Sequence, residues 1–483
     1  MEENDLFAFR RQKLQQLLDQ KLDPFGGRFD VSGNVGDVRQ AFVEGERVRV
    51  AGRLTAHRNM GKSQFLDLSD VTGRLQAYIN LKELPADQAG IFQLLDIGDF
   101  LGVEGECFVT KTGEPTIRVE KFQILAKTLR PLPDKWHGIT DIEIRNRQRY
   151  LDLIANPGSR DIFLMRSRII REIRQYLDDR GFLEVETPMM QAIAGGAAAQ
   201  PFKTHHNALD MDLFLRIAPE LYLKRLLVGG FTKIFELNRN FRNEGISRRH
   251  NPEFTMLEVY WAYADFELMA NLVEEMICVL AERVAGSLLI AHKDSEGNIK
   301  RTIDLSRPWK RARYQDLIQK VDDTWFERNR DQKLTRCKAL GVEVHPGMQE
   351  FEITQQLFEK LVEEPTANPL FVTHLPVELV PLAKQNVQNP ALVDVYELII
   401  NGQEISPGYS ELNDPVVQRQ RLTEQVGEEI QDLDEDFLLA LEHGMPPAGG
   451  IGVGIDRLVM ALTGADSIRE VILFPHLKPK SQE

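Results

Sequence analysis

The sequence predicts an α+β protein in which a small N-terminal β-barrel precedes a larger domain of mixed helices and strands. Three observations support this prediction. The 483 residues exceed what a single hydrophobic core usually organises. Short apolar or alternating runs recur over residues 46–128 with turn residues between them, as in a closed barrel such as the OB-fold. From residue 160 onward, helical and strand patterns mix without a regular βαβ alternation.

The composition is that of an ordinary globular protein, with 42% apolar and 27% charged residues. No apolar run approaches the roughly 20 residues that cross a bilayer, and the acidic segment 1–5 is unlike a secretory signal. Cys107, Cys278 and Cys337 are spaced neither as a zinc motif nor as a disulfide framework. These features predict a cytoplasmic protein with no membrane association.

The net charge of −14 argues against indiscriminate binding to nucleic acid. Residues 1–145, however, carry 20 basic and 22 acidic side chains, so most of the negative charge falls in the rest of the chain. A local basic face in the barrel is therefore compatible with the composition, and a shaped RNA site is not excluded.

Local patterns predict how the chain is divided. Helical spacing over 6–21 ends at Pro24, the Pro-rich segment 130–133 indicates a stiff linker, and 162–181 has a helical pattern. The polar segment 286–345 shows too little pattern to assign. We therefore predict a helical lead-in over 1–45, the barrel over 46–130, a linker over 131–160 and the larger domain over 161–483.

The first candidate site is the segment 240–255, where Arg and His side chains gather between two strand-like runs. The simplest geometry is an antiparallel hairpin whose loop presents guanidinium groups, which bind polyphosphates through planar forks of donors. Alternation along the returning strand places Phe254, Met256, Glu258 and Tyr260 on one face. A charged surface hairpin is the alternative for this segment taken alone.

The second candidate site is a hairpin over 397–404, where an Asn-Gly pair separates two apolar runs. A two-residue turn pairs Ile399 with Glu404 and places Glu397 and Glu404 on the same face. Two neighbouring carboxylates repel each other unless a cation lies between them, and Mg²⁺ bound to ATP phosphates would supply that cation. A solvated hairpin face with two ordinary glutamates is the alternative.

The third candidate site is the run 449–460, in which four glycines within six residues precede Arg457 and an apolar helix. Glycine lets a ligand or another backbone approach closely, and an arginine at a helix start can reach an anion or lie over a base. A tight packing turn between strand and helix is the alternative. Neither a P-loop nor a G-x-G-x-x-G motif is present, so any ATP site has another architecture.

Residues 181–188, the arginine-rich loop and the segment 454–458 resemble the three signature motifs of class II aminoacyl-tRNA synthetases. More specifically, the chain is similar nearly from end to end to the bacterial lysyl-tRNA synthetase family. The segments that carry this similarity are GGA at 195–197, PF at 201–202, HNALD at 206–210, LRIAPELYLK at 215–224 and SELNDP at 410–415.

The resemblance implies a lysine–tRNA ligase that forms lysyl-adenylate from ATP and lysine, then transfers lysine to the 3′ end of tRNA(Lys). It also implies a six-stranded antiparallel catalytic sheet flanked by helices, an N-terminal OB barrel that binds the anticodon, and a homodimer. Arg242 and Arg457 would be the catalytic residues, and Glu397 and Glu404 would hold Mg²⁺.

The resemblance further implies three sets of binding residues. ATP would be bound by Arg242, Glu244, Arg249, His250, Asn251, Phe254, Glu404 and Arg457. Lysine would be bound by Gly196, Glu220, Arg242, Glu258, Tyr260, Tyr409 and Glu411. The anticodon would be bound by Arg58, Phe65, Gln76 and Glu114.

The implied lysine pocket is chemically consistent, because each ammonium group of free lysine needs an anionic or acceptor partner once it is dehydrated. Glu220 and the Gly196 carbonyl would take the α-amine, and Glu411 with the Tyr260 hydroxyl would take the side-chain amine. A pocket for aspartate would instead need a cation in place of Glu411. In the barrel, Phe65 would stack on an unpaired base, with a barrel-core aromatic as the alternative.

One position departs from the family pattern. Pro407 stands where the family has an asparagine that contacts the substrate carboxylate, and proline has no side-chain donor and no N–H. That role does not carry over, so either the affinity for lysine is lower or Arg242 alone holds the carboxylate. The Pro-Gly pair also indicates a bulge, which is needed because plain alternation places Glu404 and Glu411 on opposite faces.

Two other functions compete with the tRNA ligase. A related ligase that lysylates a protein lacks the barrel, which residues 46–128 supply here. A nucleotide-binding regulator or RNA-binding module without catalysis need not keep Arg242, Glu397, Glu404 and Arg457 together.

Overall fold

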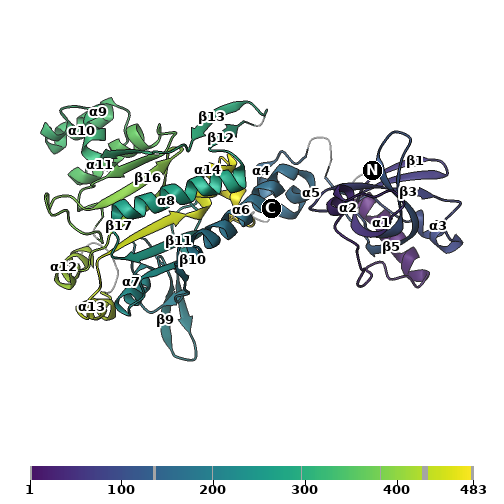
Figure 1. Ribbon diagram of the computed structural model, residues 1–483, viewed down its shortest axis with the longest axis horizontal. Helices are drawn as coiled ribbons and strands as arrows, with labels where there is room; N and C mark the ends of the chain where they lie inside the picture. The colour runs from purple at the N-terminus through teal and green to yellow at the C-terminus, as the bar shows by residue number, and fades with distance from the viewer. Residues whose placement is uncertain are drawn as a thin grey trace. The chain divides into compact units, whose positions relative to one another are not determined.

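The computed structural model describes residues 3–133, 138–197, 199–294, 296–380, 382–426 and 433–479. The chain divides into two compact units, Met1–Arg160 and Asp161–Glu483, called here the barrel unit and the larger unit. Figure 1 shows both units and labels many of their helices and strands. Within the described ranges, no helix combines the length and the apolar character that crossing a membrane requires.

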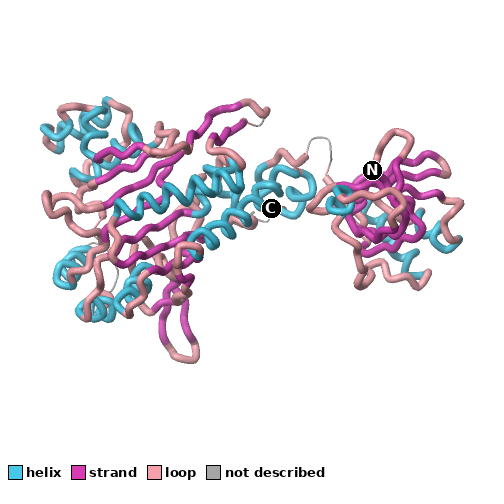
Figure 2. The backbone as a smooth tube through the Cα atoms, viewed as in Figure 1, coloured by secondary structure: helices cyan, strands magenta, loops and turns pink. Residues whose placement is uncertain are grey.

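The barrel unit holds a closed barrel in the strand order β1-β2-β3-β5-β4, as predicted (Figure 2). Side chains alternate between the barrel core and the outer face, so Leu66 and Leu68 are buried while Phe65 is only half-buried. Leu17, from the predicted N-terminal helix, packs into the same core. The strands are β1 (Arg47–Met60), β2 (Ser63–Ser69), β3 (Arg74–Asn80), β4 (Phe100–Val109) and β5 (Pro115–Ala126).

Five short or medium helices complete the barrel unit. Two of them lie in the predicted linker, where Asp152 accepts hydrogen bonds from Arg145 at 2.8 Å and Arg149 at 2.5 Å. The segment 131–160 is thus partly helical, and residues 134–137 lie outside the described ranges. The helices are α1 (Glu3–Asp19), α2 (Val35–Gln40), α3 (Ala86–Phe92), α4 (Ile142–Arg147) and α5 (Arg149–Ala155).

The larger unit is built on an eight-stranded sheet in the order β14-β15-β16-β17-β18-β11-β10-β6. The six strands from β15 to β10 are antiparallel, as predicted, and β14 and β6 add a parallel strand at each edge. The strands are β6 (Leu183–Glu184), β10 (Lys233–Phe241), β11 (Glu253–Ala262), β14 (Lys310–Arg313), β15 (Leu370–Thr373), β16 (Val395–Ile400), β17 (Gln403–Ser410) and β18 (Ala448–Gly454).

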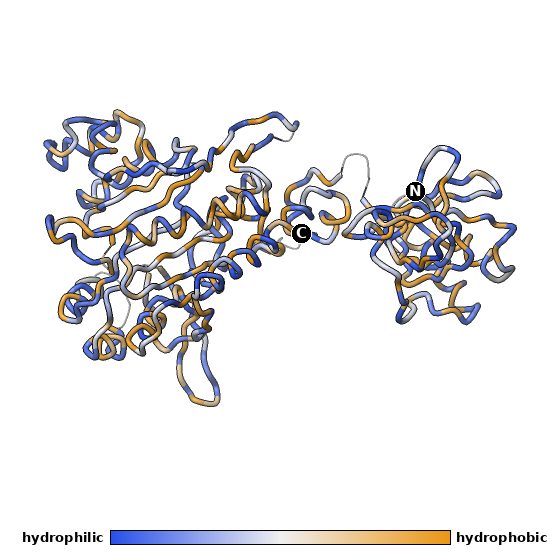
Figure 3. The backbone as a smooth tube through the Cα atoms, in the orientation of Figure 1, coloured by the Kyte–Doolittle hydropathy of each residue, from blue (hydrophilic) through white to orange (hydrophobic). Residues whose placement is uncertain are grey.

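Helices α6 (Pro157–Asp178), α8 (Phe266–Leu280) and α14 (Ile455–Thr463) share one large hydrophobic core with this sheet (Figure 1). In α6, hydrophilic and hydrophobic residues alternate at helical spacing, so only one side is apolar (Figure 3). Met269 of α8 lies against Gly449 of β18, which places α8 over one face of the sheet. The opposite face stays open to a cavity.

Smaller elements surround the sheet. The weakly patterned segment 286–345 supplies the edge strand β14 and helices that build a second core around Tyr314 and Trp325. The small strands are β7 (Met190–Gln191), β8 (Lys203–His206), β9 (Met211–Leu215), β12 (Leu289–Lys293) and β13 (Ile299–Asp304). The helices are α7 (Glu220–Val228), α9 (Tyr314–Val321), α10 (Arg330–Ala339), α11 (Glu350–Phe358), α12 (Pro415–Val426), α13 (Glu435–Glu442) and α15 (Ile468–Val471), with short turns η1 (Ala281–Ala285), η2 (Trp325–Glu327) and η3 (Glu359–Glu363).

Candidate active site

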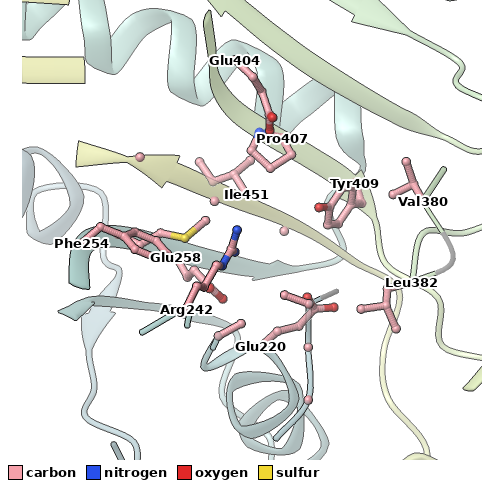
Figure 4. A pocket seen from close by; sticks show the side chains of 18 of the residues that line it. Glu220, Arg242, Phe254, Glu258, Val380, Leu382, Glu404, Pro407, Tyr409 and Ile451 are labelled. Carbon is pink, nitrogen blue, oxygen red and sulfur yellow. The ribbon is translucent and has the colours of Figure 1, made fainter. Parts of the chain in front are cut away.

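A cavity of about 440 Å³ opens on the face of the sheet opposite α8 (Figure 4). Strands β11, β17 and β18, the loop 242–252 and the start of α7 line it. All residues predicted to bind ATP, lysine or Mg²⁺ line this one cavity, although they come from distant segments. They are Gly196, Glu220, Arg242, Glu244, Arg249, His250, Asn251, Phe254, Glu258, Tyr260, Glu397, Glu404, Tyr409, Glu411 and Arg457.

The glycine-rich run forms strand β18 itself rather than a loop. A Cβ atom on Gly450 would overlap Oε1 of Glu411 and lie 2.8 Å from Cε1 of Tyr260, and one on Gly452 would overlap Met256. On the other face, a Cβ on Gly449 would lie 2.9 Å from the Asp265 carbonyl oxygen. The glycines therefore make room for side chains of neighbouring elements, and bare backbone forms the floor of the cavity.

The arginine-rich loop joins β10 to β11, as predicted. Its ends are held together by a 2.8 Å hydrogen bond from Arg242 N to the Pro252 carbonyl oxygen. The Arg242 guanidinium lies 5.1 Å from the centre of the Phe254 ring. Among the residues that the structure describes, buried Arg242 Nε and Asn251 Oδ1 have no hydrogen-bond partner, so both can bind a ligand.

Arg457 begins α14 and reaches back across the cavity. Its Nη1 donates to the Glu404 carbonyl oxygen at 2.8 Å, and its Nη2 lies 3.1 Å from Nε2 of His250. Burial and the neighbouring Arg457 guanidinium lower the pKa of His250, so the imidazole is neutral at pH 7 and accepts this hydrogen bond. Arg457 is thereby fixed between β17 and the arginine-rich loop.

Sequence reasoning missed an ion pair that aligns these parts. Asp456 Oδ1 pairs with Arg166 of α6 at 2.6 Å, and Asp456 Oδ2 accepts the backbone N–H of Thr255 at 2.8 Å. Arg166 also donates to the Thr255 hydroxyl at 2.9 Å. This Arg166–Asp456 clamp holds the start of α14 against β11. In the local sequence, the acidic residue next to Arg457 is the one feature that could have indicated it.

The second hairpin has the predicted register, with Ile399 opposite Glu404. Its turn residues Asn401 and Gly402 have φ values of 56° and 70°, as a type I′ turn requires. The register shifts between Leu398 and Ile399, which leaves Ile405 as an extra residue on β17. The irregularity thus lies before Pro407 rather than at the Pro-Gly pair, and it brings Glu404 and Glu411 to one cavity.

Pro407 itself lines the cavity and lies opposite Glu397 in the neighbouring strand. Its Cγ would lie 3.8 Å from a Cβ on Gly452, so it presents an apolar surface above the glycine strand. The predicted departure from the family pattern therefore falls inside the site, where the side chain offers no hydrogen bond to a substrate.

The carboxylates of this hairpin lie in a strongly acidic environment. Burial raises the pKa of Glu397 well above its ordinary value, and Glu404, Glu363 and Glu359 raise it further. Burial together with Glu404 also raises the pKa of Glu363 to about 7. The oxygen atoms of these closely spaced carboxylates are ligands that a hard divalent cation prefers. No group of three or more metal-ligating side chains is found in the described residues, so such an ion would take further ligands from water or phosphate.

The far end of the cavity holds three more carboxyl groups. Glu411 is 1% exposed, and its Oε1 faces Gly450 without a hydrogen-bond partner in the described part of the chain. Tyr260 Oη lies 3.3 Å from Oε2 of Glu258, and burial raises the pKa of Glu258 well above its ordinary value. Glu220 lies beside Gly196, as the predicted α-amine site requires. This end is therefore suited to a ligand that carries positive charge.

The predicted anticodon residues lie on the barrel. Arg58 is ion-paired with Asp67 at 2.8 Å, and Glu114 contacts Arg39 at 2.9 Å, so neither charge is free of partners. The Gln76 amide oxygen accepts from the Thr116 hydroxyl at 2.9 Å. The half-buried Phe65 ring lies 5.2 Å from that of Tyr78 on the outer face of the barrel. An outward aromatic ring beside paired charges is a surface on which an unpaired base can stack.

Residues 141–478 match the family model of class II tRNA synthetases (D, K and N), and residues 48–125 match that of the OB-fold nucleic-acid-binding domain. The chain therefore belongs to the class II tRNA synthetases of the D, K and N group. It is 50% identical to the lysine–tRNA ligase of Carboxydothermus hydrogenoformans, over 99% of both chains. The lysine–tRNA ligases of Syntrophomonas wolfei and Staphylococcus epidermidis are 49% and 46% identical, over 99% of this chain and 98% and 99% of theirs.

We expect Gly450→Ala to fold but to lose amino-acid activation by about 100-fold, because the new methyl group displaces the Glu411 carboxylate from its position. ATP–pyrophosphate exchange measures the activation, and thermal unfolding checks the fold. The matched control is Gly158→Ala, because a Cβ there meets no atom within 4 Å. An unchanged KM for the amino acid in Gly450→Ala would contradict this account.

Proposed function

We propose that the chain is a lysine–tRNA ligase, which activates lysine with ATP as lysyl-adenylate and then transfers it to the 3′ end of tRNA(Lys). The observation that carries this proposal is the presence of both cationic and anionic side chains in one cavity. Arg242, Arg249 and Arg457 line it together with buried Glu220 and Glu411. Free lysine and ATP match this distribution, because lysine brings two ammonium groups and ATP brings the phosphates.

Glu411 favours lysine over aspartate and asparagine, the other two amino acids of the D, K and N group. A carboxylate with one unpaired, buried oxygen favours a cationic partner, and the side-chain amine of lysine supplies it. Aspartate would meet repulsion at the same position, and asparagine would leave the charge uncompensated. Glu220 beside Gly196 would bind the α-amine, and the Tyr260 hydroxyl would join Glu411 at the side-chain amine.

In the first step, the lysine carboxylate attacks the α-phosphorus in line and diphosphate leaves. The carboxylate is ionised at neutral pH, so no general base is required. Arg242 would neutralise charge on the α-phosphate, and Arg249 and Arg457 would bind the outer phosphates. Phe254 would stack on the adenine, with Glu244, His250 and Asn251 around the nucleotide. Because Pro407 offers no donor, Arg242 alone would orient the carboxylate.

Mg²⁺ fits the donor set of the second hairpin, and Glu397 and Glu404 would hold it. The raised pKa of Glu397 supports this assignment, since a cation between the carboxylates would keep them ionised. When bound, the ion would offset the negative charge of the ATP phosphates.

In the second step, a hydroxyl of the terminal ribose of tRNA attacks the carbonyl carbon of the adenylate, and AMP leaves. The barrel would select the tRNA, with Phe65 stacking on an anticodon base and Gln76 and Glu114 bonding base edges. Arg58 would contact backbone phosphate. We also propose the domain bounds predicted above, a homodimer and a cytoplasmic location.

ATP–pyrophosphate exchange with each of the twenty amino acids, without tRNA, tests the proposed function. We expect exchange with lysine only. Exchange with another amino acid would refute the assignment of the carboxylate pocket, and exchange with none would favour a binding protein without catalysis.

Arg242→Ala should reduce lysine-dependent exchange by at least about 1,000-fold, because the charge that develops on the α-phosphate loses its guanidinium partner. Arg239→Ala is the matched control, since Arg239 lies in the same hairpin and pairs with Glu253 at 3.4 Å. Near-normal exchange by Arg242→Ala would remove Arg242 from the catalytic role.

Phe65→Ala should lower kcat/KM for tRNA charging by about 10- to 100-fold, because a stacked base is worth about 1–3 kcal/mol. Exchange without tRNA should not change. Phe100→Ala controls for the loss of an outward aromatic ring, because Phe100 is 37% exposed on another strand of the barrel. Equal losses in the two variants would argue against base stacking on Phe65.

A further inference from the structure

A lysine of the protein itself lies between the two carboxylates of the proposed amine pocket. Lys224 Nζ is 2.7 Å from Oε1 of Glu220 and 2.6 Å from Oε2 of Glu411. The Lys224 side chain is fully buried. Glu220 and Lys224 are one turn apart on α7, whereas Glu411 follows β17. A single cation thus joins two elements that bind opposite ends of the proposed substrate.

The Lys224 bridge occupies one oxygen of each carboxylate. Oε1 of Glu411 remains without a hydrogen-bond partner among the described residues and lies against the bare backbone of Gly450. Glu220 keeps Oε2 outside the contact with Lys224. Each carboxylate is therefore anchored to Lys224 through one oxygen, which leaves its second oxygen for another partner.

The charges around the bridge do not balance without a ligand. Two carboxylates share one ammonium group, and burial raises the pKa of Glu411 to about 7 although Lys224 opposes that rise. Burial also raises the pKa of Glu258 well above its ordinary value, which disfavours a further negative charge beside the bridge. The titratable and charged groups that surround the bridge are Glu220, Glu236, Glu258, Tyr260, Tyr409 and Arg421.

We propose that Lys224 is a positioning residue that favours the ionised form of Glu411 and orients both Glu220 and Glu411, so that each presents its second oxygen to one ammonium group of the substrate lysine. This inference rests on the proposed function. Two closely spaced buried carboxylates cannot both stay ionised without a nearby cation. Without Lys224, Glu411 would take up a proton at a higher pH, and the pocket would lose the charge that distinguishes lysine from neutral amino acids of similar length.

The test is the pH dependence of the KM for lysine in Lys224→Met, measured by ATP–pyrophosphate exchange. Lys224 lowers the pKa of Glu411, so its removal moves that pKa further above 7. An ammonium group binds only the ionised carboxylate, so the KM rises as the pH falls through this pKa. We expect a KM about tenfold or more above that of the parent protein at pH 7, and a gap below about threefold at pH 9. The KM for ATP should stay within about twofold.

Lys333→Met is the matched control, because it removes another buried ammonium group of the larger unit, paired with Glu350, and neither residue lines the cavity. Lys224→Arg keeps the cation and remains informative if Lys224→Met does not fold. In this second variant the rise in KM should begin at the same pH as in the parent protein. A rise shifted to higher pH in Lys224→Arg would overturn the inference.

Three further results would also overturn it: an unchanged KM for lysine in Lys224→Met, an increase that is equal at every pH, or a parallel increase in the KM for ATP. These results differ from a failure of the proposed function, which would appear as no lysine-dependent exchange in the parent protein.

Discussion

The pairing of β18 with β11 on one side and β17 on the other is the contact on which the site depends. Glycines on β18 leave its cavity face without side chains, so groups from the flanking strands can lean over it. Tyr260 from β11 and Glu411 beyond β17 meet above Gly450 in this way. The floor of the cavity is therefore rigid backbone, and the side chains at its edges determine the chemistry.

The cavity brings several buried carboxyl groups close together and places several arginines around His250. Burial raises the pKa values of Glu258, Glu397 and Glu411, whereas burial and the neighbouring arginines lower the pKa of His250. Repulsion between neighbouring groups of like charge lowers the stability of the protein, and binding a ligand of opposite charge reduces that repulsion. The same arrangement of charges therefore both holds the side chains of the cavity in place and binds the ligand. Lys224 reduces the repulsion between Glu220 and Glu411.

Local patterns predicted much of this molecule. The Asn-Gly pair predicted the register of β16 and β17, and alternation predicted which side chains of β11 face the cavity. The Arg166–Asp456 clamp and the Lys224–Glu411 pair escaped prediction, because their partners lie far apart in the sequence and no local spacing signals them. The displacement of the bulge to Ile405 and the two parallel edge strands likewise depend on tertiary pairing. The ligand assigned to each residue stays a prediction.

The position of β18 in the sheet differs from its position in the chain. It lies between β11 and β17, yet residues 448–454 follow both of these strands in sequence. While the chain is being synthesised, β11 and β17 therefore present unpaired edges, which are prone to wrong pairing with other strands. The Arg166–Asp456 clamp forms later still. A growing chain therefore completes the cavity of the candidate active site only after its last central strand has left the ribosome.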